Sequence, residues 1–89
     1  MSKFIPNLIN ENNESFILLN NVFSHEEAIE FAKEHKHNIK FICGTYTCAT
    51  EILCKMQEAG YVLKFYRVPQ YMNGSYLYDN FEVKGYLKI

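Results

Sequence analysis

Short apolar runs alternate twice with segments whose hydrophobic residues recur at helical spacing, and this alternation limits the chain to an α/β fold. Ser24 precedes the first helical segment and forms a capping box with Glu27. The second begins behind Thr47 or Thr45 as its cap, and Gly60 is predicted to be the left-handed residue that ends it. The buried faces predicted by these periods are Ala28, Phe31, Ala32 and His35 in the first helix, and Ala49, Ile52, Leu53, Met56 and Ala59 in the second.

The strands are predicted from short apolar runs and from a later change to an alternating period. Residues 16–19 and 39–43 are continuous apolar runs, typical of strands that are covered on both faces. Residues 61–69 and 76–89 alternate, and Asn73-Gly74 between them is a strong hairpin turn signal. The alternation predicts Leu77, Phe81, Val83, Leu87 and Ile89 on one side of the last strand, and Tyr76, Tyr78, Asn80, Glu82, Lys84, Tyr86 and Lys88 on the other.

The predicted order of elements is β-α-β-α-β-β. It gives a mixed sheet of four strands, or five if the N-terminal arm adds one, with two helices and a C-terminal β-hairpin. Two right-handed crossovers would make the first strands parallel, and the hairpin adds an antiparallel pair. Residues 1–14 are predicted to form an N-terminal arm, and residues 15–89 a single α/β domain.

Composition excludes some partners and favours self-association. A chain of 89 residues buries only about 60–65% of its unfolded surface, so its core is thin. Seven Phe and seven Tyr add large apolar rings, and pairing with a second copy would bury more of them, so we expect a homodimer. The net charge of −1 leaves no positive surplus to hold the backbone of a long nucleic acid. A compact anion held by backbone amides is not excluded.

The cysteines and histidines indicate neither a disulfide framework nor a metal site. Cys43, Cys48 and Cys54 are odd in number and lack CxxC spacing, so we interpret them as reduced thiols in a cytoplasmic protein. Cys43 as a nucleophile at a helix start is the alternative. His35 and His37 diverge at a helix end, so no metal and no cofactor are expected. No apolar stretch suits a signal peptide or a membrane span, so no membrane partner is expected.

The segment Gly44-Thr45-Tyr46-Thr47 lies between a predicted strand and a predicted helix. At that edge of an α/β sheet, free backbone amides and the helix dipole converge and favour an anion. Glycine would let the backbone approach a phosphate, and two threonine hydroxyls would add donors. The segment is not a Walker A loop, because no Lys follows and the glycines are too few. A simple helix cap is the competing interpretation.

Tyrosines of the hairpin offer a second contact surface. Tyr76, Tyr78 and Tyr86 are predicted to share one side of the last strand, and Arg67 lies between two more tyrosines of the preceding strand. Such rings stack on bases or pack against a second protein. They also commonly pack against helices or remain half-exposed without any partner.

Three segments together carry a resemblance. They are "LLNNVFS" after the first strand, the strand-Gly-Thr-Tyr-Thr-helix junction, and "KFYRVPQYMNGSYLYDNFEVKGYL" at the hairpin. In this order they resemble the small viral ring-nuclease family, compact α/β dimers of archaeal viruses and bacteriophages that cut or bind cyclic oligoadenylates. The family has Gly-His followed by Ser/Thr-Thr at the second helix and a hairpin that ends in a Lys-Gly-Arg-like stretch. Gly44, Thr47 and Lys84-Gly85 match in kind, and the resemblance covers residues 16–87.

The departures from that family bear on catalysis. Thr45 stands where the family has its catalytic histidine, Tyr86 stands where it has arginine, and the sequence ends at Ile89, before the family's acidic C-terminal segment. Threonine cannot protonate a leaving oxygen near neutral pH, so the resemblance implies binding without general acid catalysis. No catalytic residue is therefore predicted.

We expect a small viral-type protein that sequesters a cyclic nucleotide, or another phosphate-bearing signal, and so counters host defence. In this hypothesis the helix start holds phosphate, the tyrosines stack on bases, and Arg67 or Lys64 neutralises charge. One alternative is a protein-protein inhibitor that docks on a host enzyme through its tyrosines, and another is a ring-nuclease-like phosphodiesterase. The predicted ligand-binding residues are Gly44, Thr45, Tyr46, Thr47, Arg67, Tyr76 and Tyr78.

Overall fold

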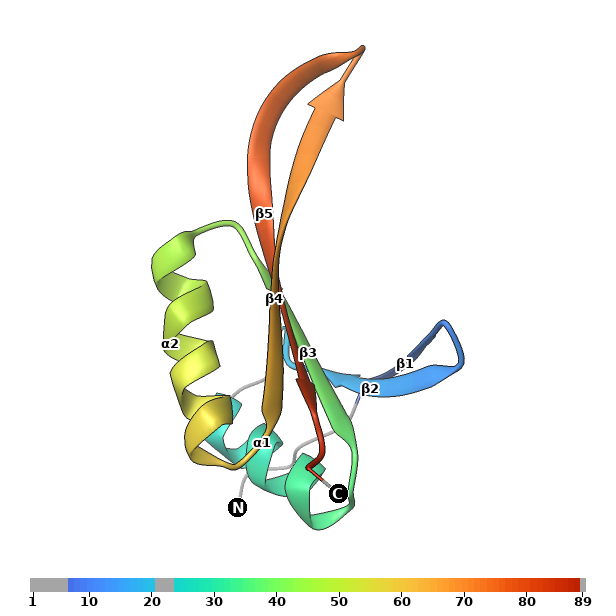
Figure 1. Ribbon diagram of the computed structural model, residues 1–89, viewed down its shortest axis with the longest axis vertical. Helices are drawn as coiled ribbons and strands as arrows, with labels where there is room; N and C mark the ends of the chain where they lie inside the picture. Colours follow the sequence, from blue (N-terminus) through green and yellow to red (C-terminus); the bar gives the residue numbers. More distant parts are fainter. Residues whose placement is uncertain (1–6, 21–23, 89) are drawn as a thin grey trace.

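The computed structural model describes residues 7–20 and 24–88, and it confirms an α/β fold with a mixed five-stranded sheet and two helices (Figure 1). Residues 1–6 of the predicted arm, and Ile89, lie outside this description. The sheet order is β1-β2-β3-β5-β4. The elements are β1 (Leu8–Glu11), β2 (Glu14–Leu18), α1 (His25–Glu34), β3 (Asn38–Cys43), α2 (Tyr46–Glu58), β4 (Val62–Met72) and β5 (Ser75–Tyr86).

The predicted strand directions are correct. Strands β2 and β3 are parallel across α1, whereas β5 is antiparallel to both β3 and β4. Strand β4 therefore runs parallel to β3 but lies one position further out, because β5 occupies the place between them. The C-terminal hairpin thus inserts its second strand into the centre of the sheet and leaves β4 at an edge (Figure 1).

The N-terminal arm supplies the fifth strand. Strand β1 pairs antiparallel with β2 through a turn at Asn12 and Asn13. Both asparagines have positive φ, 49° and 65°, in the left-handed region that Asn tolerates better than most residues. The polar stretch at residues 10–14 is therefore a tight hairpin turn with its flanking strand ends, and the arm adds the fifth strand that the sequence left open.

Both helices lie on one face of the sheet, and the main core lies between them and the sheet (Figure 1). The Ser24 hydroxyl caps α1 by accepting from the Glu27 N–H at 3.2 Å, as the capping box predicts. At the end of α2, Gly60 has φ 93°, which confirms its left-handed role. The fully buried large side chains of the core between the helices and the sheet are Ile17, Leu19, Ile39, Met56 and Val83.

Gly85 lets α2 lie close to β5. A Cβ at this position would overlap the terminal methyl of Met56, which is fully buried, and would also touch Tyr61. Any larger residue must displace the Met56 side chain from a packed core. Packing therefore accounts for the glycine of the Lys84-Gly85 pair without any ligand.

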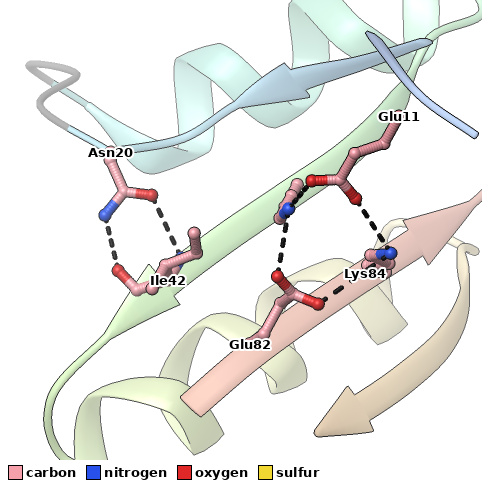
Figure 2. Close-up of polar contacts among 6 residues, drawn as sticks. Glu11, Asn20, Ile42, Glu82 and Lys84 are labelled. Atoms are coloured by element: carbon pink, nitrogen blue, oxygen red, sulfur yellow. Dashed lines mark hydrogen bonds and ion pairs between the residues drawn. The ribbon is translucent and has the colours of Figure 1, made fainter. Parts of the chain in front are cut away.

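Asn20 completes the hydrogen bonding of the central strand beyond the end of β2. Its side-chain amide donates to the Ile42 carbonyl and accepts from the Ile42 N–H, the latter at 3.0 Å (Figure 2). The amide thus replaces the peptide group that a longer β2 would have presented. Both backbone polar groups of Ile42 are satisfied on the side of β3 that faces β2.

The helix-free face of the sheet carries a four-charge network in place of a second helical layer. Glu11 from β1 contacts Lys40 and also Lys84, the latter at 3.1 Å, and Glu82 contacts Lys40 at 3.0 Å (Figure 2). The Lys40 side chain is only 6% exposed. Phe16 is fully buried on the same face, with the Lys84 ammonium 5.5 Å from its ring centre.

The two carboxylates keep both lysines charged. Desolvation alone would lower the pKa of the Lys40 ammonium, but hydrogen bonds to Glu11 and Glu82 outweigh that effect, and the pKa is raised. Hydrogen bonds from Lys40 and Lys84 lower the pKa of the Glu11 carboxyl. Glu11 therefore links β1 to β3 and β5 across the helix-free face of the sheet.

We predict that Glu11→Gln lowers the free energy of unfolding at pH 7 by about 1–2 kcal/mol, because a buried ammonium loses one of its two charged partners. The value is modest because Glu11 is 36% exposed and Glu82 remains. Urea unfolding of both proteins measures the difference. Glu14→Gln, an exposed carboxylate on the same hairpin, is the matched control and should change stability by less than about 0.5 kcal/mol.

The difference should also depend on pH with a defined sign. Because the folded-state pKa of Glu11 is lowered, its contribution is present above the ordinary carboxyl value of 4.5 and is lost as the pH falls through the folded value. The difference in stability between wild type and Glu11→Gln should therefore begin to shrink as the pH falls below 4.5 and disappear below the folded-state value. An unchanged difference at about pH 3 would contradict this assignment.

Candidate ligand-binding face

The β3–α2 junction presents backbone donors without nearby negative charge. Thr45 is the N-cap, and its hydroxyl accepts from the Cys48 N–H at 3.2 Å. The N–H groups of Tyr46 and Thr47 precede the first intrahelical hydrogen bond, so the helix itself gives them no acceptor. The described first turn of α2 contains no acidic side chain, whereas α1 begins with Glu26 and Glu27. The dipole of α2 is therefore the one left without a compensating carboxylate.

Gly44 is not required by the fold. Its φ lies outside the left-handed region, in contrast to Gly60 and Gly74. A Cβ at Gly44 would meet no described atom within 4 Å. An alanine would therefore fit, and the missing side chain instead leaves the backbone of this junction open to close approach from outside.

Three aromatic rings meet beside the start of α2. The Tyr46 ring centre lies 5.8 Å from that of Phe65 on β4 and 5.8 Å from that of Phe81 on β5, and the last two are 5.9 Å apart. Tyr46 remains 60% exposed. We call Tyr46, Phe65 and Phe81 the hairpin-base cluster. It fixes the start of α2 against the helix-side face of the hairpin, and more than half of the Tyr46 side chain remains exposed.

Arg67 continues this face toward the hairpin tip. It pairs with Phe81 across the ladder, and its side chain is 72% exposed. Its Nε lies 3.7 Å from Asp79 Oδ2, so the guanidinium is partly neutralised. Partial desolvation, and then a hydrogen bond to Asp79, raise the pKa of the Tyr76 phenol. Arg67, Asp79 and Tyr76 therefore form one polar group beyond the aromatic cluster.

Tyr76 and Tyr78 do not share a side of the hairpin, so that prediction is wrong. A register shift between Gln70 and Tyr71 sets Tyr78 against Gln70 and Tyr76 against Tyr71. Neighbouring residues of a strand point to opposite faces, so their partners are separated as well. The ring centres of Tyr71 and Tyr76 lie 6.1 Å apart.

The structure brings some predicted site residues together and separates others. Gly44, Thr45, Tyr46 and Thr47 lie at the α2 start, and Arg67 and Tyr76 lie on the adjoining helix-side face. Tyr78 and Lys64 lie on the opposite face. The Lys64 ammonium is 5.3 Å from the ring centre of Tyr86, so it cannot serve the same ligand as Arg67.

Sequence reasoning missed Phe65, Phe81 and Asp79 as members of this face. Counting residues back from the Asn73-Gly74 turn would set Arg67 opposite Asn80, because no feature of the sequence announces the bulge. The observed partner is Phe81. The apolar alternation of β5 could have identified Phe81 as a member of this face, because it placed Phe81 on the core side.

The chemistry of Cys43 differs from that of an activated nucleophile. Burial raises the pKa of its thiol, and its Sγ donates a hydrogen bond to the Thr45 carbonyl oxygen at 3.3 Å. The thiol is therefore protonated near neutral pH, which disfavours nucleophilic attack. Within residues 7–20 and 24–88, no group of three or more His, Cys, Asp or Glu side chains could hold a metal ion.

A groove between α1 and α2 has the wrong charge for a phosphate ligand. Lys55 and Glu26 cross it at 3.3 Å, and the remaining carboxylates outnumber that single cation. An anion would be repelled there. The residues that line it are Glu26, Ile29, Glu30, Glu51, Cys54, Lys55 and Glu58.

Comparison with protein-family models, with curated proteins and with solved structures gave no match, so it bears neither way on the ring-nuclease resemblance. Neither described helix combines the length and the apolar character needed to cross a bilayer. The chemistry of the face therefore rests on the residues of this chain alone.

We predict that Cys54 reacts with iodoacetamide at least about tenfold faster than Cys43 at pH 7.5, because Cys54 is exposed and the Cys43 thiol is protonated. Mass spectrometry of peptides at timed intervals measures both rates. The Cys43 rate should rise steeply as the pH approaches 10. Faster labelling of Cys43 at neutral pH would instead indicate an activated thiolate.

Proposed function

We propose that this chain binds a cyclic nucleotide, or a related phosphate ligand with a stacking base, on the helix-side face of its hairpin base. One observation carries the proposal: Tyr46, in the first turn of α2, contacts Phe81, and Phe81 is the cross-strand partner of Arg67. Phosphate would sit on the Tyr46 and Thr47 amides, where Gly44 allows close approach. A base would stack on the exposed part of Tyr46.

Arg67 would bind the phosphate only in competition with Asp79. A second phosphate, or the other side of the same phosphate, would offer the guanidinium a bidentate partner. Asp79 is a weaker partner, because its Oδ2 lies 3.7 Å from Arg67 Nε. Binding would therefore exchange a long ion pair for a shorter one. This exchange predicts that removal of the Asp79 charge strengthens binding.

Capture without cleavage is the proposed mode of action. Thr45 stands where the resembling family has its catalytic histidine, and the nearby thiol of Cys43 has a raised pKa, so neither group is suited to act as a general acid or base near pH 7. A protein of this kind would lower the free concentration of a signal in proportion to its own amount. In a virus-infected cell this would blunt a defence pathway that relies on a cyclic nucleotide. We also propose that it acts as a homodimer in the cytoplasm.

Isothermal titration against cyclic mono-, di- and oligonucleotides, with inorganic phosphate as a reference, tests the proposal. For whichever nucleotide binds, Arg67→Gln should weaken binding about ten- to a hundredfold, as loss of a charged hydrogen bond does. Asp79→Asn should strengthen it. Lys33→Gln removes the same charge from α1 and is the matched control, with no expected change.

Two results would count against nucleotide capture. One is the absence of binding heat with every nucleotide. The other is equal weakening of binding by Arg67→Gln and Lys33→Gln, because this would mean that only the net charge of the protein affects affinity. Chromatography of the recovered ligand distinguishes capture from the third possibility, a ring-nuclease-like phosphodiesterase. Shortened or linear product that accumulates with time would make the protein a phosphodiesterase, whereas intact ligand supports capture.

A protein-protein inhibitor is the second candidate, and the hairpin tip is the observation that favours it. Five large apolar side chains around the turn are at least half exposed, a combination typical of contact surfaces. In this case a host enzyme would be the partner. The exposed residues are Tyr71, Met72, Tyr76, Leu77 and Tyr78.

The two candidates predict opposite mutant behaviour. If the tip binds a host protein, Tyr78→Ala should remove a specific band from an affinity pull-down, whereas Thr47→Ala should retain it. If the α2 start binds a nucleotide, Thr47→Ala should weaken the titration and Tyr78→Ala should leave it unchanged, because Tyr78 lies on the other face. Retention of the band by both variants would exclude Tyr78 as an anchor.

A further inference from the structure

The outer edge of β4 is long, apolar and unpaired. Strand β4 has eleven residues, and its outer side hydrogen-bonds to no other strand of the described chain. Its exposed large side chains include Val62, Phe65, Tyr66 and Val68, each 38–50% exposed. The opposite edge of the sheet, β1, has only four residues and is fixed by the Glu11 network. Figure 1 shows β4 running the length of the molecule. An edge of this kind invites a further strand.

The hydrogen-bond alternation of the central strand, β3, determines which residues of β4 point their backbone N–H and C=O groups outward. Ile42 directs both of its backbone groups to Asn20, and the Lys40 carbonyl accepts from the Leu19 N–H at 2.8 Å, so these residues face β2. The residues between them, such as Phe41, must therefore face β5. Their partner Val83 then faces β3, and the alternation leaves Glu82 and Lys84 to bond β4.

Carrying this alternation one strand further identifies the open groups. Tyr66 and Lys64 are the partners of Glu82 and Lys84, so they bond β5, and the residues between them face outward. Pro69 agrees with this parity, because it lacks an N–H and belongs to the outward set. The outward residues that retain a free N–H and C=O on the near side of Pro69 are Leu63, Phe65 and Arg67.

We infer that β4 of a second copy pairs antiparallel with this edge, about a two-fold axis that passes through Phe65. The inference rests on the proposed homodimer and names its surface. Phe65 would face the partner's Phe65, and Leu63 would face the partner's Arg67. The three outward residues of each copy would thus exchange all of their free backbone groups, and the two sheets would become one.

The charges of β4 select this register among its neighbours. An axis through Lys64 would oppose two ammonium groups, and an axis through Arg67 would oppose two guanidinium groups. An axis through Tyr66 would set Leu63 against the partner's Pro69, which cannot donate. The axis through Phe65 avoids all three conflicts.

The same register also creates favourable side-chain pairs. On the helix-free face, Lys64 would lie beside the partner's Tyr66, and a lysine beside a tyrosine ring is attracted to its π-face. On the helix-side face, the two Phe65 rings would pack together at the axis. This match of lysine with tyrosine and of phenylalanine with phenylalanine, together with the avoided contacts between like charges, is the reason for choosing a second copy over an unrelated strand.

Site-specific cross-linking tests the register. In a Cys54→Ser background, Phe65→Cys would place two thiols on directly opposed residues about 5.5 Å apart at Cα, within the range of a disulfide. Tyr66→Cys reports the competing axis, and Tyr78→Cys is a control of similar exposure away from the edge. Under mild oxidation we expect Phe65→Cys to form a covalent dimer at least about tenfold faster than either control.

A charge exchange tests the same surface without touching Phe65. Tyr66→Lys opposes Lys64 of the partner subunit twice, and should weaken the dimer about tenfold in analytical ultracentrifugation. Adding Lys64→Glu to Tyr66→Lys restores opposite charges and should recover the dimer. Circular dichroism of each variant verifies that the sheet is intact.

The outcomes separate this interface from the proposals on which it rests. A wild-type chain that stays monomeric at about 100 μM overturns both the homodimer and its interface. A dimer in which Phe65→Cys cross-links no faster than the controls overturns the interface alone. Nucleotide binding is measured separately by titration, and its absence would count neither for nor against the homodimer or its interface.

Discussion

The backbone polar groups of β3 all need partners, because this strand lies at the centre of the sheet and is buried. Strand β2 ends before it can cover Ile42, and the amide of Asn20 takes over both bonds. This fixes which residues of β3 face β5. Through β5 the same alternation fixes which residues of β4 point outward, so the pairing of β2 with β3 and the free backbone groups of β4 belong to one hydrogen-bond pattern.

The one-sided placement of the helices raises a second requirement, since the other face of the sheet must also exclude water. The chain covers it with Phe16, with the stems of two lysines, and with carboxylates that neutralise them. Buried ion pairs of this kind contribute little net stability compared with apolar packing. The network nevertheless ties the N-terminal hairpin to the rest of the sheet, because Glu11 of β1 contacts Lys40 of β3 and Lys84 of β5.

Local signals in the sequence were sufficient for the elements and insufficient for the site. Ser24, Gly60 and Asn73-Gly74 each act within a few residues, and the structure confirms all three. The bulge at Gln70 and Tyr71 has no such local signal, and it appears only as a shift in the pairing of β4 with β5. It shifts the partner of Arg67 by one residue and sends Tyr76 and Tyr78 to opposite faces. The Glu11–Lys40 contact joins residues 29 apart and was equally invisible.

The end of β3 divides the hairpin into two regions with separate physical demands. Below it, Phe65 and Phe81 are held by Tyr46, so any ligand there meets a preformed surface. Above it, the strands continue as a two-stranded ribbon (Figure 1), whose tip carries the exposed rings of Tyr71, Tyr76 and Tyr78. Such a ribbon is marginally stable alone. Its length is therefore unexplained by the fold, and the tip is the region where a macromolecular partner would gain most by supplying the missing contacts.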